Sequence, residues 1–151
     1  MSQKQFISFT IGGEEYGVDI MAIREIKGWT ATTELPNAPP YMRGVIDLRG
    51  TIVPILDLSA RFNRGRAEAT ARHVIIVVAV GEQWAGLLVD AVADILAVSD
   101  SDIQAVPSIE HDDHSARFLT GLVTVEGRMV ALLDLENVFD SHHLTAAATA
   151  A

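Results

Sequence analysis

The feature that most constrains the fold is a segment of fifteen residues that occurs twice. Residues 44–58 read GVIDLRGTIVPILDL, and residues 121–135 read GLVTVEGRMVALLDL. Both copies keep two glycines, a final Leu-Asp-Leu and a phenylalanine four residues further on, at a constant offset of 77 (121 − 44). Composition alone does not produce this spacing, so the chain contains an internal structural duplication.

Each copy predicts a β-hairpin followed by one helical turn. Gly50 and Gly127 lie between arms rich in aliphatic residues, and glycine takes the positive φ that a tight hairpin requires. Asp57 and Asp134 follow the second arm, where an aspartate side chain caps the free amides of a short helix. We expect the phenylalanine that closes each copy to fold back onto its sheet.

Outside the hairpins, the pattern predicts further short elements. Within residues 6–11, Ile7, Phe9 and Ile11 fall on one face and Ser8 and Thr10 on the other, as in a half-buried strand. Asp19 stands where it can cap a short helix containing Ile20 and Ile23. Residues 63–72 are polar and lack strand periodicity, so we expect a loop there between the two halves.

A weaker similarity extends the repeat to the first strands of each half. Glu25 matches Asp94 at an offset of 69 (94 − 25), which is eight less than the offset of the hairpins. The second half therefore carries about eight extra residues before its hairpin. We place this insertion within residues 108–116.

Many short strands separated by glycine turns indicate a fold that is mainly all-β, with two small barrels packed together and short helices. We expect a single domain over residues 1–140 and a flexible tail over residues 141–151. Within the domain, the first barrel is expected at about 14–71 and the second at about 72–140. Exchange of the N-terminal strand between the barrels is compatible with this division.

Composition excludes several classes of function. The chain has 151 residues, no cysteine and a formal net charge of −9, which repels nucleic acid and anionic lipid. No apolar run reaches the ~18 residues of a membrane span, and the first five residues do not form a secretory leader. We therefore predict a cytoplasmic protein without disulfides, without nucleic-acid partners and without direct membrane insertion.

The sequence contains little that indicates catalysis. His111 to His114 read HDDH and place four candidate metal ligands in a row, but neighbouring side chains on an extended loop point in different directions. We expect a solvated loop there, and a metal-dependent enzyme remains the alternative. Asp57 and Asp134 are interpreted as helix caps and not as paired catalytic carboxylates. The prediction is a protein without enzymatic activity, metal or cofactor.

The two copies differ at the tip of the hairpin. The first carries Asp47 and Arg49, where the second carries Thr124 and Glu126. A variable, solvent-exposed turn is one explanation. The other is an interaction surface, because the planar guanidinium of arginine makes several directed bonds at interfaces. The second explanation marks the first hairpin as the functional face.

At these residues the chain resembles the CheW family. The resemblance rests on EEYGVDI at 14–20, IREI at 23–26 and RGVIDLRGTIVPILDL at 43–58, and it extends from about Phe6 to about Phe139. It implies two intertwined five-stranded SH3-like barrels and no catalysis. It also implies an adaptor that couples the cytoplasmic tips of methyl-accepting chemoreceptors to the histidine kinase CheA, in arrays associated with the membrane.

The resemblance further implies two contact surfaces. Asp47 belongs to the first, although the family usually has asparagine at this position. The kinase contact maps to Arg72 and His73. The receptor-contact side comprises Ile20, Ile23, Glu25, Gly44, Asp47, Arg49, Val92 and Ile95.

Physically, the four aliphatic residues of this set are expected to line a groove for an amphipathic receptor helix, with Arg49 and Glu25 at its rim. The alternative is that the aliphatic side chains form core between the barrels. A second alternative concerns the pathway, since a CheW-like scaffold also suits an array that controls pili or second-messenger synthesis.

Overall fold

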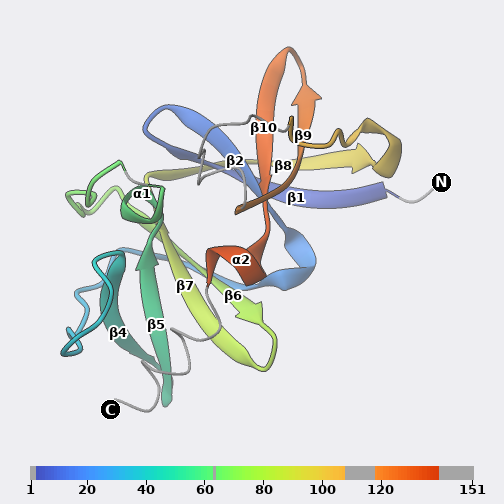
Figure 1. The fold of residues 1–151 in the computed structure, drawn as a ribbon. Coiled ribbons are helices and arrows are strands. Elements are labelled where there is room, and N and C mark those ends of the chain that lie inside the picture. Colours follow the sequence, from blue (N-terminus) through green and yellow to red (C-terminus); the bar gives the residue numbers. More distant parts are fainter. Residues whose placement is uncertain (1–2, 63, 108–117, 140–151) are drawn as a thin grey trace.

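The computed structural model describes residues 3–62, 64–107 and 118–139, which form two five-stranded sheets (Figure 1). Sheet A has the order β8 (Ala91–Ser99), β1 (Gln3–Ile11), β2 (Glu14–Asp19), β10 (Arg128–Leu133) and β9 (Leu119–Val125). Sheet B has the order β3 (Ile23–Gly28), β6 (Val74–Val80), β7 (Gln83–Val89), β5 (Thr51–Asp57) and β4 (Met42–Leu48). The short helices are η1 (Ile20–Ala22), α1 (Leu58–Arg61), η2 (Asp100–Asp102) and α2 (Leu135–Val138).

Each sheet takes strands from both halves of the chain. Figure 1 shows blue β1 and β2 beside orange β9 and β10, whereas teal β4 and β5 lie beside green β6 and β7. The expected division between residues 71 and 72 therefore does not separate the sheets. The reason is reciprocal exchange: β2 leaves sheet A at Asp19 and η1 leads into sheet B, while β7 leaves sheet B and β8 returns to sheet A.

The duplication seen in the sequence is also present in the backbone. Strands β4 and β5 and helix α1 have their counterparts in β9, β10 and α2 at an offset of 77 residues. Each hairpin turns through two residues with positive φ, Arg49 (50°) and Gly50 (90°) in one and Glu126 (51°) and Gly127 (77°) in the other. Two consecutive positive φ values define the type I′ turn, which matches the twist of the flanking strands.

The predicted caps and closing phenylalanines are confirmed. Asp57 accepts a hydrogen bond from the amide of Ala60, and Asp134 accepts one from the amide of Asn137. Phe62 and Phe139 are both buried in the largest apolar cluster, which lies between the sheets. Two smaller clusters fill the interiors of the barrels, one within each sheet. The predicted fold class, mainly β with two SH3-like barrels and short helices, is therefore confirmed.

The helix predicted after Asp19 is only partly correct. Asp19 does cap a helix by accepting from the amide of Met21, but that helix is a single 3₁₀ turn. From Ile23 onward the chain is a strand paired with β6, where Ile23 lies opposite Val78. Pairing of β-branched residues with a neighbouring strand overrides the local helical spacing.

Arg61 of α1 lies between the two halves of the duplication. Its guanidinium carbon is 4.3 Å from the ring centroid of Tyr41 and 4.6 Å from that of Phe118, and these rings are equivalent at the offset of 77. Its Nε donates to the carbonyl of Val138, which is the residue equivalent to Arg61 itself. The pseudo-twofold relation therefore brings α1 and α2 side by side.

The predicted insertion at 108–116, the His111–His114 sequence and the tail at 141–151 lie outside the described residues. Among the residues that are described, none of the helices has the length and hydropathy needed to cross a bilayer.

Candidate functional site

The predicted contact residues Glu25 and Arg49 meet in the structure. Glu25 lies on β3 and Arg49 at the tip of the β4–β5 hairpin, and a guanidinium nitrogen of Arg49 donates to Glu25 Oε1 over 2.6 Å. Strands β3 and β4 are the two outer strands of sheet B, so this pair lies across the seam where the sheet curls into a barrel. The Arg49 side chain is 70% exposed and offers the rest of its donors to solvent.

The hydrogen bond between Arg49 and Glu25 favours the charged form of both side chains. The hydrogen bond from Arg49 holds the pKa of the Glu25 carboxyl below its usual value, and the same bond raises the pKa of Arg49. Both side chains therefore remain charged across the neutral range. The pair forms a fixed, directional polar element on the surface of the protein.

Asp47 supports the turn that presents Arg49. Its Oδ1 accepts a hydrogen bond from the amide of Gly50 over 2.7 Å, which closes the tip of the hairpin. Arg49 has a φ of 50°, a conformation that non-glycine residues adopt at a cost. The structure thus places Asp47 beside Arg49 as a turn-stabilising residue.

Gly44 is required for close approach of two backbone segments. A Cβ atom at Gly44 would overlap the carbonyl oxygen of Thr33, and the φ of 131° disfavours other residues. Thr33 and Val45 exchange two backbone hydrogen bonds of 2.9 and 2.8 Å beside it. Gly44 is itself buried, so its contribution to the predicted surface is to hold β4 against the segment that follows β3.

The four predicted aliphatic residues divide between core and surface. Ile20, Ile23 and Val92 are half-buried and pack against the cluster between the sheets. Ile95 on β8 is 56% exposed. The alternative that these side chains form core thus holds in part for three of the four. Sequence reasoning missed Met21 and Ile26, which are 79% and 42% exposed near Glu25 in the chain.

A surface hollow of about 260 Å³ lies elsewhere, and none of the predicted contact residues lines it. Arg64 donates to Glu14 over 2.6 Å at this hollow, and Tyr16 donates to the same carboxylate over 3.1 Å. Burial is the main cause that raises the pKa of Tyr16 to about 12. The lining residues are Glu14, Tyr16, Phe62, Arg64, Leu119 and Ala131.

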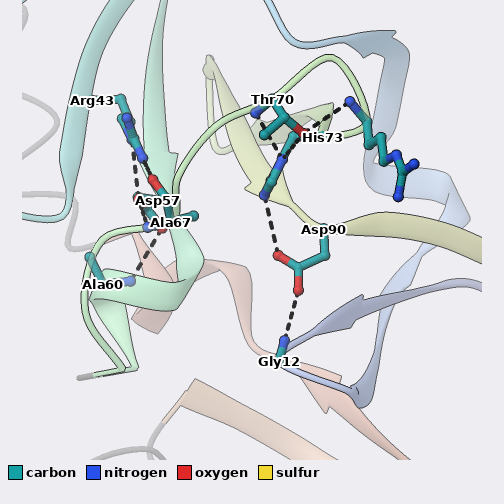
Figure 2. A network of polar contacts seen from close by, with 9 residues as sticks. Gly12, Arg43, Asp57, Ala60, Ala67, Thr70, His73 and Asp90 are labelled. Atoms are coloured by element: carbon teal, nitrogen blue, oxygen red, sulfur yellow. Dashed lines mark hydrogen bonds and ion pairs between the residues drawn. The ribbon is translucent and has the colours of Figure 1, made fainter.

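The predicted kinase-contact residues lie at the end of the loop between the halves, beside the junction of the two sheets (Figure 2). The amide of Thr70 donates to His73 Nδ1 over 3.0 Å, so the hydrogen of the neutral ring resides on Nε2. That nitrogen faces Asp90 Oδ1 at 3.6 Å, and Asp90 in turn accepts from the amide of Gly12. His73 is mostly buried within these contacts, whereas Arg72 is exposed.

A buried ion pair in the first half was missed by the sequence analysis. Arg43 Nε donates to Asp57 Oδ2 over 3.1 Å, and the Asp57 side chain is fully buried. Asp57 also accepts from the amide of Ala67, and Arg43 donates to the carbonyl of Ala67. Asp57 is thus both a helix cap and a binding point for the loop. The sequence does contain a signal for this ion pair. At the offset of 77, Arg43 of the first copy corresponds to Thr120 of the second, so a basic residue stands beside only one of the two capping aspartates.

Carboxylate and imidazole groups do not converge on a metal site in the described part of the chain, where no cluster of three such residues is found. Asp57 and Asp134 cap separate helices. The described residues offer a directional polar contact at the Arg49–Glu25 pair and exposed apolar side chains at Met21, Ile26 and Ile95, and polar and apolar groups of this kind occur together at protein-binding surfaces.

Comparison with known proteins agrees with this description. Residues 5–143 match the model of the CheW-like domain. The chain is 51% identical to the chemotaxis protein CheW of Rhizobium meliloti, over 95% of this chain and 92% of the relative. It is 36% identical to the chemotaxis protein CheW of Klebsiella aerogenes, over 93% and 84%. The crystal structure of the scaffolding protein TtCheW from Thermoanaerobacter tengcongensis superposes with a TM-score of 0.82 at 30% identity, covering 92% of this chain and 89% of that one.

Proposed function

This chain belongs to the CheW-like domain family, and we propose that it is a non-catalytic adaptor that couples chemoreceptor tips to a CheA-type histidine kinase. The observation that carries the receptor half of the proposal is the Arg49–Glu25 pair. It fixes a guanidinium at the rim of sheet B, on a turn closed by Asp47. Two exposed apolar residues, Met21 on η1 and Ile26 on β3, lie close to Glu25 in the chain.

The receptor is expected to present an amphipathic helix from its cytoplasmic tip. A helix binds through apolar side chains at helical spacing, and charged groups at the rim of its binding surface fix its orientation. Ile95 and the exposed edges of Ile20, Ile23 and Val92 supply the apolar contacts in this proposal. Arg49 and Glu25 supply the polar ones. The protein itself acts in the cytoplasm and is recruited to arrays at the membrane through the receptor.

The test is a pull-down with a purified receptor tip fragment and, separately, with the kinase. We expect Arg49→Glu to remove receptor binding, because it places two carboxylates together where an ion pair stood. Kinase binding should stay as in the wild type, and the unfolding midpoint should fall only slightly, since the Arg49 side chain is exposed and exposed ion pairs contribute little to stability.

The duplication provides a matched control. Glu126 occupies the equivalent turn of the other hairpin and has nearly the same φ, so Glu126→Arg changes charge in the same backbone context. Receptor binding is expected to survive this change. Unchanged receptor binding by Arg49→Glu would remove the first hairpin from the proposed interface.

A further inference from the structure

The loop between the two halves ends in a turn that a histidine side chain helps to close. The amide of His73 donates to the carbonyl of Thr70 over 3.0 Å, which closes the turn over residues 70–73. The amide of Arg72 donates to the Thr70 hydroxyl over 3.2 Å within the same turn. The amide of Thr70 donates in the opposite direction, to His73 Nδ1 over 3.0 Å. The start of the turn is therefore held by the imidazole ring.

The hydrogen bond from the Thr70 amide exists only while His73 Nδ1 carries no hydrogen. A backbone N–H is a donor under all conditions, so the ring nitrogen opposite it must accept. The Thr70 hydroxyl also lies 3.1 Å from Nδ1, but a hydroxyl donates to a neutral ring and accepts from a protonated one. The amide cannot reverse its role in this way. Protonation of Nδ1 therefore opposes the bond from the Thr70 amide.

The other ring nitrogen faces a carboxylate that stands between the two sheets. His73 Nε2 lies 3.6 Å from Asp90 Oδ1, and Asp90 Oδ2 accepts from the amide of Gly12 over 2.8 Å (Figure 2). Asp90 follows β7 of sheet B and precedes β8 of sheet A, and Gly12 lies in the turn between β1 and β2 of sheet A. A protonated ring attracts this carboxylate more strongly than a neutral ring does. The contact with Asp90 is thus strengthened by the same proton that opposes the contact with Thr70.

The neighbouring elements bring no second ionic contact to the ring. Among the residues that the structure describes, Asp90 alone has a charged group within ion-pair distance of the His73 ring. At the turn between β1 and β2, Arg64 and Glu14 are paired with each other over 2.6 Å. Beyond the end of β3, the amide of Trp29 donates to the carbonyl of His73 and not to its ring.

The remaining charged side chains nearby belong to the loop and to β3. Glu68 and Arg72 on the loop are exposed, where solvent and salt screen their charges. Lys27 on β3 acts electrostatically on Glu25. The response of the His73 ring to pH is therefore governed by Thr70 on one side and by Asp90 on the other.

We propose that His73 is a pH-sensitive switch that exchanges one anchor of the protein for another. In its neutral form, the ring holds the end of the loop through the amide of Thr70. In its protonated form, the ring releases that amide and holds Asp90, at the junction of the two sheets, more firmly. Histidine is the side chain that ordinarily changes its charge between about pH 5 and about pH 8. The inference concerns the molecule alone and does not depend on the adaptor function.

The released stretch is short, because other contacts keep the loop attached at both sides. The amide of Ala67 donates to the buried Asp57 over 2.9 Å, and the carbonyl of His73 accepts from Trp29 over 3.1 Å. Neither of these bonds involves the imidazole. Protonation is therefore expected to loosen residues 68–72 and to leave the rest of the loop in place.

The experiment follows the full chain by NMR from about pH 8 to about pH 5. The nitrogen chemical shifts of the His73 ring should show a neutral form with its hydrogen on Nε2 at the upper end. As the ring takes up its second proton, the amide of Thr70 should lose its protection against solvent exchange by about fivefold or more, with the same midpoint. The amide of Gly12 should keep its protection, because Asp90 still accepts from it. The amide of Ala60, bonded to the buried Asp57, is the internal control.

Two variants separate the two anchors. His73→Asn keeps a side-chain acceptor close to the position of Nδ1 and does not titrate, so the Thr70 amide should stay protected over the whole range. Asp90→Asn removes the charge and keeps an oxygen that accepts from Gly12. In that variant the release of Thr70 should move to lower pH, because the protonated ring has lost its counterion.

Several results would overturn the switch, and they leave the adaptor function untouched. A ring that stays neutral over the whole range, or a neutral ring with its hydrogen on Nδ1, contradicts the mechanism directly. The same holds if the Thr70 amide keeps its protection while the ring titrates, or if it loses protection equally in His73→Asn. An unchanged midpoint in Asp90→Asn would overturn the role of Asp90 as the second anchor.

Discussion

The guanidinium of Arg49 lies 2.6 Å from the carboxylate of Glu25, and this pair links the two outer strands of one five-stranded sheet. Arg49 lies at the turn of the β4–β5 hairpin and Glu25 lies on β3. The two residues are 24 positions apart in the sequence. The hairpin tip is thus held against the opposite edge of the barrel. The same two side chains remain accessible to a partner.

Exchange of the two charges distinguishes a structural pair from a direct receptor contact. Arg49→Glu/Glu25→Arg restores attraction across the seam but reverses the polarity of the rim. We expect the double variant to keep a wild-type unfolding midpoint and to remain unable to bind the receptor tip, because the receptor contacts each charge in its own place. Recovery of receptor binding in the double variant would instead assign the pair a purely structural role.

The pKa of Glu25 provides a pH-dependent test. The Arg49 hydrogen bond lowers this pKa below the usual value of 4.5, so the pair stabilises the folded state fully above that pH. The contribution is lost as the pH falls through the lowered pKa. A carboxyl NMR titration should therefore show a midpoint for Glu25 below 4.5, and Arg49→Gln should move it upward. An identical midpoint in both proteins would contradict the pairing.

Arg43 is expected to be the more important arginine for stability. Arg43→Met leaves the fully buried Asp57 without its cation, and removal of one member of a buried pair costs about 3 kcal/mol or more. Thr120 occupies the equivalent position in the second copy, where its hydroxyl donates to the carbonyl of Leu132 over 3.4 Å. Thr120→Val should cost about 1 kcal/mol or less. Urea unfolding of the two variants provides the comparison.

Gly44 is expected to be intolerant of any side chain. In Gly44→Ala, the new methyl group meets the Thr33 carbonyl, so the backbone must move and we expect a loss of more than about 2 kcal/mol. Gly13→Ala is the control, because Gly13 also has a positive φ of 84° but open space around its Cα. That variant should lose about 1 kcal/mol. Similar thermal unfolding of both variants would show that close approach at Gly44 is unimportant.

Tyr16 should make the protein sensitive to alkali. Its pKa is raised from 10.0 to about 12, chiefly by burial, so the folded state favours the neutral phenol. This preference is fully present below pH 10 and is lost as the pH rises toward 12, which reduces the free energy of unfolding by up to about 2 kcal/mol. Tyr41→Phe leaves Tyr16 as the single tyrosine, and its ultraviolet absorbance should titrate near 12. A midpoint at 10 would contradict the buried hydrogen-bonded geometry.

The parts of the fold that depend on local pattern were predictable. The offset of 77, the turn glycines, the capping roles of Asp57 and Asp134 and the buried phenylalanines all follow from residues close together in the chain. The helix after Asp19 was overestimated because its local spacing competes with pairing to β6, a strand some fifty residues away. The capping role of Asp57 follows from the local pattern, but its buried partner Arg43 lies one residue before the repeated segment, outside that pattern.

For the site, the sequence singled out Arg49 through the difference between the two copies, but it did not reveal that Glu25 is its partner. That contact arises only when sheet B curls and brings its outer strands together. Packing of the two sheets against each other buries parts of Ile20 and Ile23, which the resemblance places in a groove for the receptor helix.

The sequence by itself determined that the chain is a duplicated, mainly β protein with hairpins of the same length, since register and turn type are local properties. Only the tertiary structure decided which strands share a sheet. Reciprocal exchange of strand pairs depends on long-range pairing, such as that of β2 with β10 and of β5 with β7. The same long-range geometry decided that Arg43 and Arg61 are used internally, Arg43 in its pair with Asp57 and Arg61 in its contact with the carbonyl of Val138.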